Sequence, residues 1–219
     1  MYLINKCKCP NCNNTALSVF DAEGNICETG DFCTKHHPNR NDITLEIYNY
    51  IYNNDKIIGL NASGIHFAGL NMTNKKFYGC NFQHCFFTAI EANNIVSRLS
   101  TFSYSLFTDC SMKNCDIKFT NFSGSKFIHH LFNGSEIVNT NFLGISTEQT
   151  SFDDTDLRKS SFANAYLHDV SFRNCNIKST NFHFSTLENC SFRLSNTKEA
   201  IFDKQGSDML TGIDTSDVL

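Results

Sequence analysis

Residues 171–192 read SFRNCNIKSTNFHFSTLENCSF, and an apolar side chain returns at every fifth position: Phe172, Ile177, Phe182, Leu187 and Phe192. A β-strand repeats its faces every two residues and an α-helix every 3.6 residues, so neither explains a period of five. The period also extends far beyond this stretch. Steps of five from Phe67 to Phe202 visit 28 positions, of which 16 are Phe and eight are Leu, Ile or Met.

The residue two places before each apolar position is small. Of the 28 residues in this second series, 21 are Ala, Cys, Ser, Thr or Val. In an extended segment these two positions point to the same side, so each five-residue unit offers one small and one large side chain to the interior. The remaining positions are rich in Asn, Ser, Thr, Lys, Asp and Gly, which suit a turn that faces water. Each unit is therefore predicted to be a short extended piece followed by a corner.

Such units cannot bury their own apolar side chains, so they must stack as the coils of a solenoid. One class of positions spaced by 20 residues contains only Phe, and we interpret it as a ladder on one face: Phe82, Phe102, Phe122, Phe142, Phe162, Phe182 and Phe202. A 20-residue coil holds four units. The sequence therefore predicts an all-β, four-sided parallel solenoid of about seven coils over residues 60–202.

Four positions of the apolar series are not large and apolar: Ala92, Ser97, Thr147 and Thr197. At the first three the preceding small slot holds Ile instead, so that the summed interior volume is roughly kept, as a close-packed core requires. The phase never slips, and we expect distorted corners there without a long insertion. Thr197 lacks this compensation and lies near the end of the rod, where water could reach it.

The units ANAYL, TNFHF, SFRNC and CNIKS carry a pattern that resembles the pentapeptide-repeat family, whose consensus is roughly A(D/N)LXX. The resemblance covers residues 60–202, about two thirds of the chain. It implies a right-handed quadrilateral β-helix. It implies no particular function, because proteins with different roles share this fold.

The 11 cysteines fall into two groups. Six occupy the small interior slot of a unit and are expected to pack as small apolar residues: Cys80, Cys85, Cys110, Cys115, Cys175 and Cys190. The other five lie in the first 33 residues, within CKCPNC (7–12), at Cys27 and at the start of CTKHH (33–37). Paired Cys knuckles followed by C-x2-H are the spacing of a tetrahedral zinc site.

We therefore predict a zinc-binding module over residues 1–40, with Cys12, Cys33 and His36 as ligands and either Cys7 or Cys9 as the fourth. His37 and Cys27 are reserves. The segment is similar to small zinc modules that precede the repeats of some bacterial proteins, and this resemblance favours Cys7. Four protein ligands would make the zinc structural, because a catalytic zinc keeps a position for water. Disulfide bonds are the alternative for these cysteines.

Both ends of a solenoid expose unpaired backbone groups and must be capped or used for association. Residues 41–59 are predicted to hold a capping helix and a linker, with Asn41 or Asp42 as the N-cap and Ile43, Ile47, Tyr50 and Ile51 on one helical face. Residues 203–219 form an acidic tail that could cap the last coil, pair with a second chain or fray.

Composition and motifs argue against catalysis. The sequence has no Gly-rich phosphate loop and no nucleophile motif. His130 occupies an interior slot, where a hydrogen-bonded core histidine is the simplest interpretation. No apolar run suits a membrane span or a leader peptide, so we expect a cytoplasmic protein. We predict a non-enzymatic interaction or scaffold protein with an unidentified protein partner, no nucleic-acid or membrane partner, and dimerisation through an end of the rod as an option.

Relatives in the family that protect type II topoisomerases from quinolones are thought to imitate DNA, which makes gyrase binding the alternative function. Residues 60–202 carry 12 Lys and Arg against 11 Asp and Glu, a net charge of +1, whereas a DNA mimic should be strongly negative. A zinc-dependent enzyme is the third and most distant hypothesis. An interaction surface should show outward apolar residues on neighbouring coils, and Phe86, Leu106 and Ile128 form such a cluster; local packing under the capping segment is the alternative for these residues.

Overall fold

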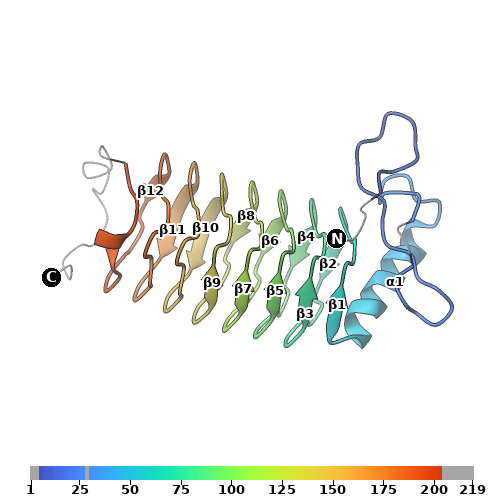
Figure 1. The fold of residues 1–219 in the computed structure, drawn as a ribbon, viewed down its shortest axis with the longest axis horizontal. Helices are drawn as coiled ribbons and strands as arrows, with labels where there is room; N and C mark the ends of the chain where they lie inside the picture. The colour runs from blue at the N-terminus through green and yellow to red at the C-terminus, as the bar shows by residue number, and fades with distance from the viewer. Residues whose placement is uncertain (1–4, 28–29, 204–219) are drawn as a thin grey trace.

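The computed structural model describes residues 5–27 and 30–203 as a small amino-terminal module, one helix and a long parallel β-solenoid (Figure 1). The helix α1 spans Arg40–Asn53. One face of the rod is a five-stranded sheet made of β1 (Lys56–Ile58), β3 (Lys76–Tyr78), β5 (Val96–Arg98), β7 (Asp116–Lys118) and β9 (Glu136–Val138). The predicted role of residues 204–219 lies outside the described residues.

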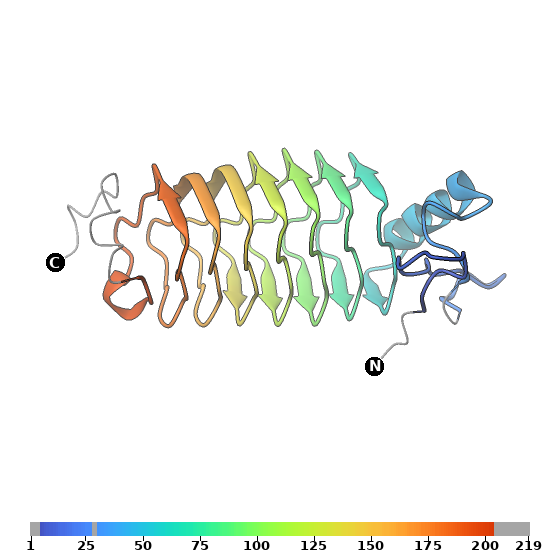
Figure 2. The ribbon, with the colours of Figure 1, turned by 90° about the horizontal axis from the view of Figure 1, so that it is seen from above.

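A second, seven-stranded sheet lies on the opposite side of the rod (Figure 2). Its strands are β2 (His66–Ala68), β4 (Phe86–Thr88), β6 (Leu106–Thr108), β8 (Lys126–Ile128), β10 (Ser146–Ser151), β11 (Tyr166–Ser171) and β12 (Thr186–Glu188). A 3-10 turn, η1 (Thr197–Glu199), follows the last strand. Within the described residues, no helix has the length and apolar character to cross a membrane.

Every strand pair is parallel and shifted by 20 residues, which confirms four units per coil. Lys56 lies opposite Lys76, Phe87 opposite Phe107, and Leu167 opposite Leu187. Isolated bridges on the other two sides have the same shift, such as Asn121 with Asn141. The solenoid begins at β1, four residues earlier than predicted, because Ile57 already obeys the five-residue period and is fully buried.

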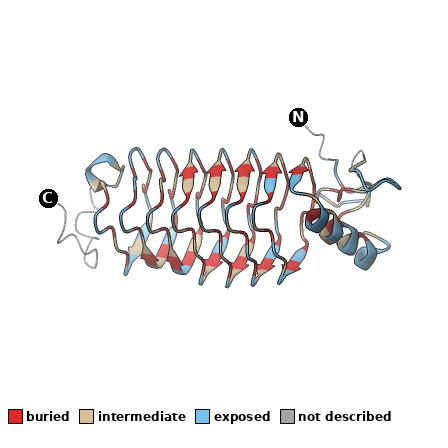
Figure 3. Cartoon of the chain, turned by 90° about the horizontal axis from the view of Figure 1, so that it is seen from below, coloured by how far each residue is buried: buried red, intermediate tan, exposed pale blue. Residues whose placement is uncertain are grey.

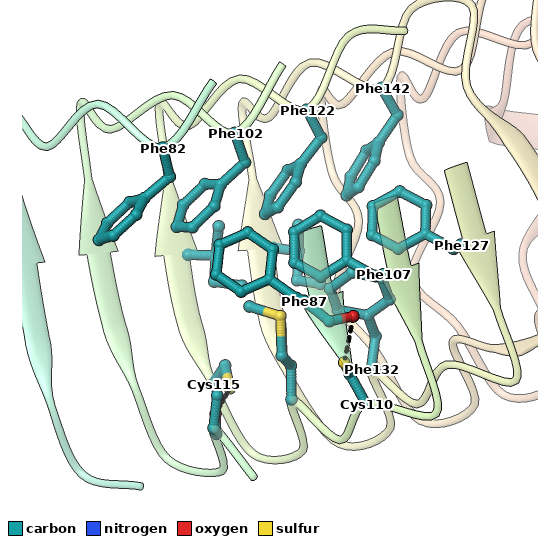
Figure 4. Close-up of a cluster of buried hydrophobic side chains, with 14 of the residues drawn as sticks. Phe82, Phe87, Phe102, Phe107, Cys110, Cys115, Phe122, Phe127, Phe132 and Phe142 are labelled. Atoms are coloured by element: carbon teal, nitrogen blue, oxygen red, sulfur yellow. Dashed lines mark hydrogen bonds between the residues drawn. The ribbon is translucent and has the colours of Figure 1, made fainter. Parts of the chain in front are cut away.

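The interior contains three Phe ladders that run along the rod. Two of these ladders lie side by side in Figure 4. Along the predicted Phe82–Phe202 ladder, successive rings stack with centroids 4.7–5.2 Å apart and planes within 12°. Rings of different ladders meet edge to face, as Phe142 and Phe152 do at 86°. Offset stacks and edge-to-face contacts are the favoured aromatic geometries. The five-residue apolar period thus places Phe rings in stacks along the rod axis. The buried apolar residues form one continuous core (Figure 3).

The expectation of distorted corners at the small interior positions is wrong. The corner residues beside them, Asn94, Leu99 and Gln149, have φ angles of 58°, 53° and 50°, like the other corners of the rod. Hydrogen bonds explain why small polar groups fit there without distortion: the Ser97 hydroxyl lies 3.1 Å from the buried Thr120 hydroxyl. Thr147 Oγ1 likewise accepts a hydrogen bond from the backbone N–H of His168.

The volume compensation proposed for Ala92 is incomplete. A void of about 20 Å³ remains beside it, lined by apolar side chains that include Ile90, Ile95 and Phe102. Thr197 lies in η1 and is half-buried at the end of the rod, as the sequence suggested.

The first coil is covered by α1 and by the amino-terminal module. The helix begins at Arg40 with Asn39 as its N-cap, so the prediction of Asn41 or Asp42 as the cap is wrong. Asp42 lies in the first turn, where its negative charge interacts favourably with the helix dipole. The predicted face is largely correct, since Ile43, Ile47 and Ile51 are buried.

The module continues the hydrogen-bonding pattern of the solenoid. The backbone N–H of Ser18 donates to Asn61 O, and Ser18 Oγ accepts from the N–H of Asn61. Lys75 fills an interior slot but extends its Nζ to Tyr52 O at 2.9 Å and Asp55 at 3.2 Å, and so ties the end of α1 to the next coil. The front edge of the rod is therefore bonded to the module at Asn61 and covered by α1.

Candidate functional site

Four side chains of the amino-terminal module converge: Cys7, Cys12, Cys33 and His36. Two tight turns bring them together. Cys12 N–H donates to Cys9 O in the first turn, and His36 N–H donates to Cys33 O in the second. The backbone N–H of Lys8 donates to Asp31 O and joins the two turns.

The spacing of the four donor atoms fits a tetrahedral metal ion. All four lie within 4.8 Å of one another. The Sγ atoms of Cys12 and Cys33 are 3.8 Å apart, and Nδ1 of His36 lies 3.4 Å from Cys7 Sγ and 3.5 Å from Cys33 Sγ. Zinc bonds of about 2.3 Å to sulfur and about 2.0–2.1 Å to nitrogen would place tetrahedral ligands about 3.8 Å (S to S) and about 3.6 Å (S to N) apart. The donor set and its geometry therefore suit a zinc ion.

The remaining candidates lie outside this cluster. Of the two possible fourth ligands, the structure brings Cys7 and not Cys9 to the other three. Neither reserve joins them: the Sγ of Cys27 lies 4.0 Å from Asn25 O, and His37 Nδ1 accepts a hydrogen bond from the backbone of Asn39. None of the cysteines in the described residues forms a disulfide, so the alternative pairing is not seen.

The local electrostatics favour thiolates at two of the four ligands. Burial raises the pKa of the Cys7 thiol, but backbone hydrogen bonds from Cys33 and Cys9 outweigh it and lower the pKa to about 7. Burial also opposes ionisation of Cys33, whose pKa is nevertheless lowered by hydrogen bonds from the Lys35 backbone and the Asn14 amide. Thiolates are the form in which cysteine binds a metal.

The prediction that His130 is a hydrogen-bonded core histidine is correct about its burial and wrong about its hydrogen bonds. Its side chain is fully buried among Phe107, Phe127 and Phe132, and neither ring nitrogen has a hydrogen-bond partner among residues 5–27 and 30–203. Burial alone lowers its pKa to about 3. A neutral ring enclosed by apolar side chains is not arranged for acid–base chemistry.

The exposed apolar residues only partly match the predicted cluster. Phe86 is 50% exposed, while Leu106 and Ile128 are half-buried. A larger set of exposed apolar side chains, which the predicted cluster did not include, lies at corners with φ between 53° and 63°: Leu99, Tyr104, Phe119, Phe184 and Leu194. The signal was present, because each occupies the second position after the apolar residue, where other coils have Gly, Asn or Asp.

The repeat geometry agrees with a match to a family model. Residues 125–202 match the model described as "Pentapeptide repeat region". This part of the chain is similar to that family, and the coils before residue 125 continue the same parallel solenoid in the same register. No curated protein sequence matches the chain.

Several solved structures are similar to the chain. A trypsin-treated variant of QnrB1, titled a plasmid-mediated fluoroquinolone resistance protein, is 17% identical, with 71% of this chain and 87% of that one covered and a TM-score of 0.34. A pentapeptide repeat protein from the thylakoid lumen of Arabidopsis thaliana is 14% identical, covering 67% and 74%, with a TM-score of 0.30. HetL from Nostoc, titled as involved in heterocyst differentiation regulation, is 10% identical, covering 68% and 90%, with a TM-score of 0.24.

Proposed function

We propose that Cys7, Cys12, Cys33 and His36 hold one structural zinc ion. Four protein ligands leave no position for a reacting water, so the ion would fix the two turns rather than catalyse a reaction. These turns carry the segment that pairs with the first coil through Ser18 and Asn61. Zinc binding would therefore stabilise the cap at the front of the rod.

We further propose that the chain is a non-catalytic protein-interaction module. The observation that carries this proposal is the exposure of large apolar side chains on an unfavourable backbone conformation. Leu99 is 74% exposed and Phe119 is 58% exposed, on neighbouring coils, at φ angles of 53°. Left-handed backbone costs a bulky residue about 1–2 kcal/mol, and an exposed side chain gains little burial in return. Contact with another protein would supply that burial.

Quantitative affinity capture from the native lysate tests the interaction role. The bait proteins are the full chain, a Leu99→Asn/Phe119→Asn variant, and a control carrying Lys56→Gln/Lys76→Gln on the five-stranded face. We expect a protein that the full chain and the control retain and the corner variant loses at least about fivefold. Retention of the same proteins at the same levels by all three baits would contradict a role for these corners, and absence of any specific protein would contradict the interaction function.

A topoisomerase-directed DNA mimic is not supported by the surface charges. One column of carboxylates on the five-stranded face could resemble a phosphate line, but each carboxylate has a cation beside it. Asp116 pairs with Arg98 and Lys118, and Lys118 also lies 2.7 Å from Glu136. Asp156 pairs with Arg158 at 2.7 Å. Gyrase supercoiling titrated with the purified protein should therefore be unaffected below a large molar excess, and strong inhibition or quinolone protection would reverse this conclusion.

A further inference from the structure

A hollow of about 570 Å³ lies where the amino-terminal module meets the first coils of the seven-stranded face. Residues from three separate parts of the chain line it: the metal-site turns, the start of α1, and the corners of successive coils. A neighbouring hollow of about 450 Å³ along α1 shares Thr34, Arg40 and Gly64 with it. The two form one continuous surface, which we call the junction groove.

The junction groove is cationic although the chain as a whole is acidic. Its lining includes Lys35 and Arg40, both exposed, and none of the described residues that line it is Asp or Glu. The chain has a net charge of −4. A third hollow between the module and α1 has the opposite character, because its described lining includes Asp21, Glu23 and Glu46 without any Lys or Arg. The module thus separates charge between two hollows, and the junction groove is the one suited to an anionic partner.

An aromatic wall completes the groove on the side of the solenoid. Phe86 and Tyr104 are 50% and 62% exposed and line the same hollow. The Tyr104 ring is held in place from both sides. It stacks on His84 of the preceding coil, with centroids 5.4 Å apart and planes at 10°, and a Cβ added to Gly124 of the next coil would meet it at 2.6 Å. A rigid, exposed aromatic side chain loses little entropy when a partner binds.

Two residues with side-chain amides, Asn13 and Gln83, also line the hollow. An amide can donate to and accept from a peptide backbone at once. Cations for carboxylates, exposed aromatic side chains for an apolar side chain and amides for the backbone together match an extended peptide segment.

We propose that the junction groove binds an acidic peptide segment that carries an aromatic or large aliphatic side chain, contributed by a partner protein. This inference rests on the proposed interaction function and adds a second surface, distinct from the Leu99 and Phe119 corners, with its own partner class. A nucleic-acid strand fits the groove less well, since strand binding uses a basic path along many phosphates and residues 60–202 carry a net charge of only +1.

The metal site positions one wall of the groove. Lys35 lies between two of the proposed ligands, Cys33 and His36, and its orientation depends on their turn. Thr34 of the same turn packs so closely against Gly64 of the first coil that an added Cβ would lie 2.6 Å from its Oγ1. Loss of metal should therefore weaken peptide binding without any direct contact between metal and peptide.

The test is a selection from a displayed library of random 12-residue peptides on the full-length, metal-loaded protein. We expect enrichment of peptides that combine Asp or Glu with Phe, Tyr, Trp or Leu. A fluorescein-labelled enriched peptide should then bind at least about tenfold more weakly to Lys35→Glu/Arg40→Glu and to Phe86→Ala/Tyr104→Ala. The matched control Lys56→Glu/Lys76→Glu has the same change of net charge on the opposite face and should bind like the wild type.

Melting temperature and metal content of each variant establish that it is folded; Arg40→Glu alone replaces the double variant if Lys35→Glu disturbs the metal. Enrichment without acidic residues, or equal loss with the control variant, would overturn the inference. Labelled oligothymidine that binds more tightly than any peptide, and that loses this binding in Lys35→Glu/Arg40→Glu, would assign the groove to nucleic acid instead. A lysate partner that depends on Leu99 and Phe119 but not on the groove would leave the proposed function standing and remove only this inference.

Discussion

The two groups of cysteines show how differently the two regions of the molecule are held together. The repeat thiols are sealed in the core, where each Sγ–H donates to a carbonyl of the previous coil; Cys110, for example, lies 3.4 Å from Phe87 O (Figure 4). Burial raises the pKa of Cys85, Cys115 and Cys175 to about 12. In the amino-terminal module the pKa of Cys7 falls to about 7, so the same side chain is a small apolar residue in one region and a proposed metal ligand in the other.

The contrast separates two ways of specifying structure. The rod is fixed by a period repeated along its whole length, so many residues specify the same register and no single residue decides it. The module is too small for such a core, and in our proposal four ligand atoms around one metal ion hold its turns together. We therefore expect a substitution in the rod to lower its stability without changing its register, and loss of one proposed ligand to release the turns of the module.

The largest expected difference is in thiol reactivity. Cys9 and Cys27 lie outside the cluster and should react with a thiol reagent in the native protein. Chelation of the metal should expose Cys7, Cys12 and Cys33 as well, and denaturation should expose all 11 cysteines. Mass spectrometry after alkylation should therefore count two, five and 11 modified thiols in the three states.

Elemental analysis should accompany this experiment and find about one zinc per chain. Cys12→Ser and His36→Ala should lose it, whereas Cys9→Ser and His37→Ala should keep it. Full zinc content in the first two variants would exclude the site. The far-ultraviolet β signal should survive chelation; if the whole rod melted instead, the module would be an essential cap.

Removal of one interior ring should cost about 3–5 kcal/mol in the free energy of unfolding. Phe142→Ala leaves a void between Phe122 and Phe162, which stack on it at 5.2 and 4.7 Å, and rigid neighbouring coils cannot collapse into it. The outward Lys126→Ala should cost well under about 1 kcal/mol. Chemical denaturation measures both. Equal losses would mean that the inward register is wrong.

His130 should make the stability of the rod depend on pH. Its pKa is about 3 in the folded state against about 6.5 when unfolded, so the unfolded chain binds the extra proton between these values. Its contribution is complete above pH 6.5 and is lost as the pH falls toward 3, by about 2 kcal/mol at pH 5. His130→Cys, which copies Cys110 of the preceding coil, should remove this loss, while His183→Gln should retain it. Parallel pH profiles of wild type and His130→Cys would contradict the burial of a neutral imidazole.

The smallest expected effect is a gain. Leu99→Asn should raise the free energy of unfolding by about 0.5–1 kcal/mol, because Asn accepts left-handed backbone better and Leu99 buries little. A destabilisation of more than about 1 kcal/mol would show that Leu99 serves the fold rather than a partner.

The repeat region could be derived from sequence because its signal is redundant. The 16 Phe residues of the period report one geometry many times, and the 20-residue class Phe82–Phe202 alone gives the number of units per coil. Ile57 extends the same period, so even the missed start at β1 could have been found. The helix start was missed because Asn39, Asn41 and Asp42 are equally good caps by residue type.

The candidate site was less determined by sequence. Spacing alone allows Cys12 to pair with Cys7 or with Cys9, and the choice depends on how the turn at 9–12 folds back toward Cys33. The unpartnered state of His130 depends on three Phe side chains from neighbouring positions of the stack. The junction groove depends on the docking of the module against the corners at His84 and Tyr104, which no local pattern encodes.

The pairing of Ser18 with Asn61 allows the solenoid to fold in one direction, from the amino-terminal module toward the last coil. The module and α1 are synthesised before the first coil. Each new 20-residue segment that leaves the ribosome can therefore pair with a coil that has already folded. At about 5–20 residues per second, each coil would have about 1–4 s to settle before the next arrives. The rod can thus fold coil by coil from its amino-terminal end during synthesis. A full-length chain that refolds from the denatured state would lose this sequential order of folding.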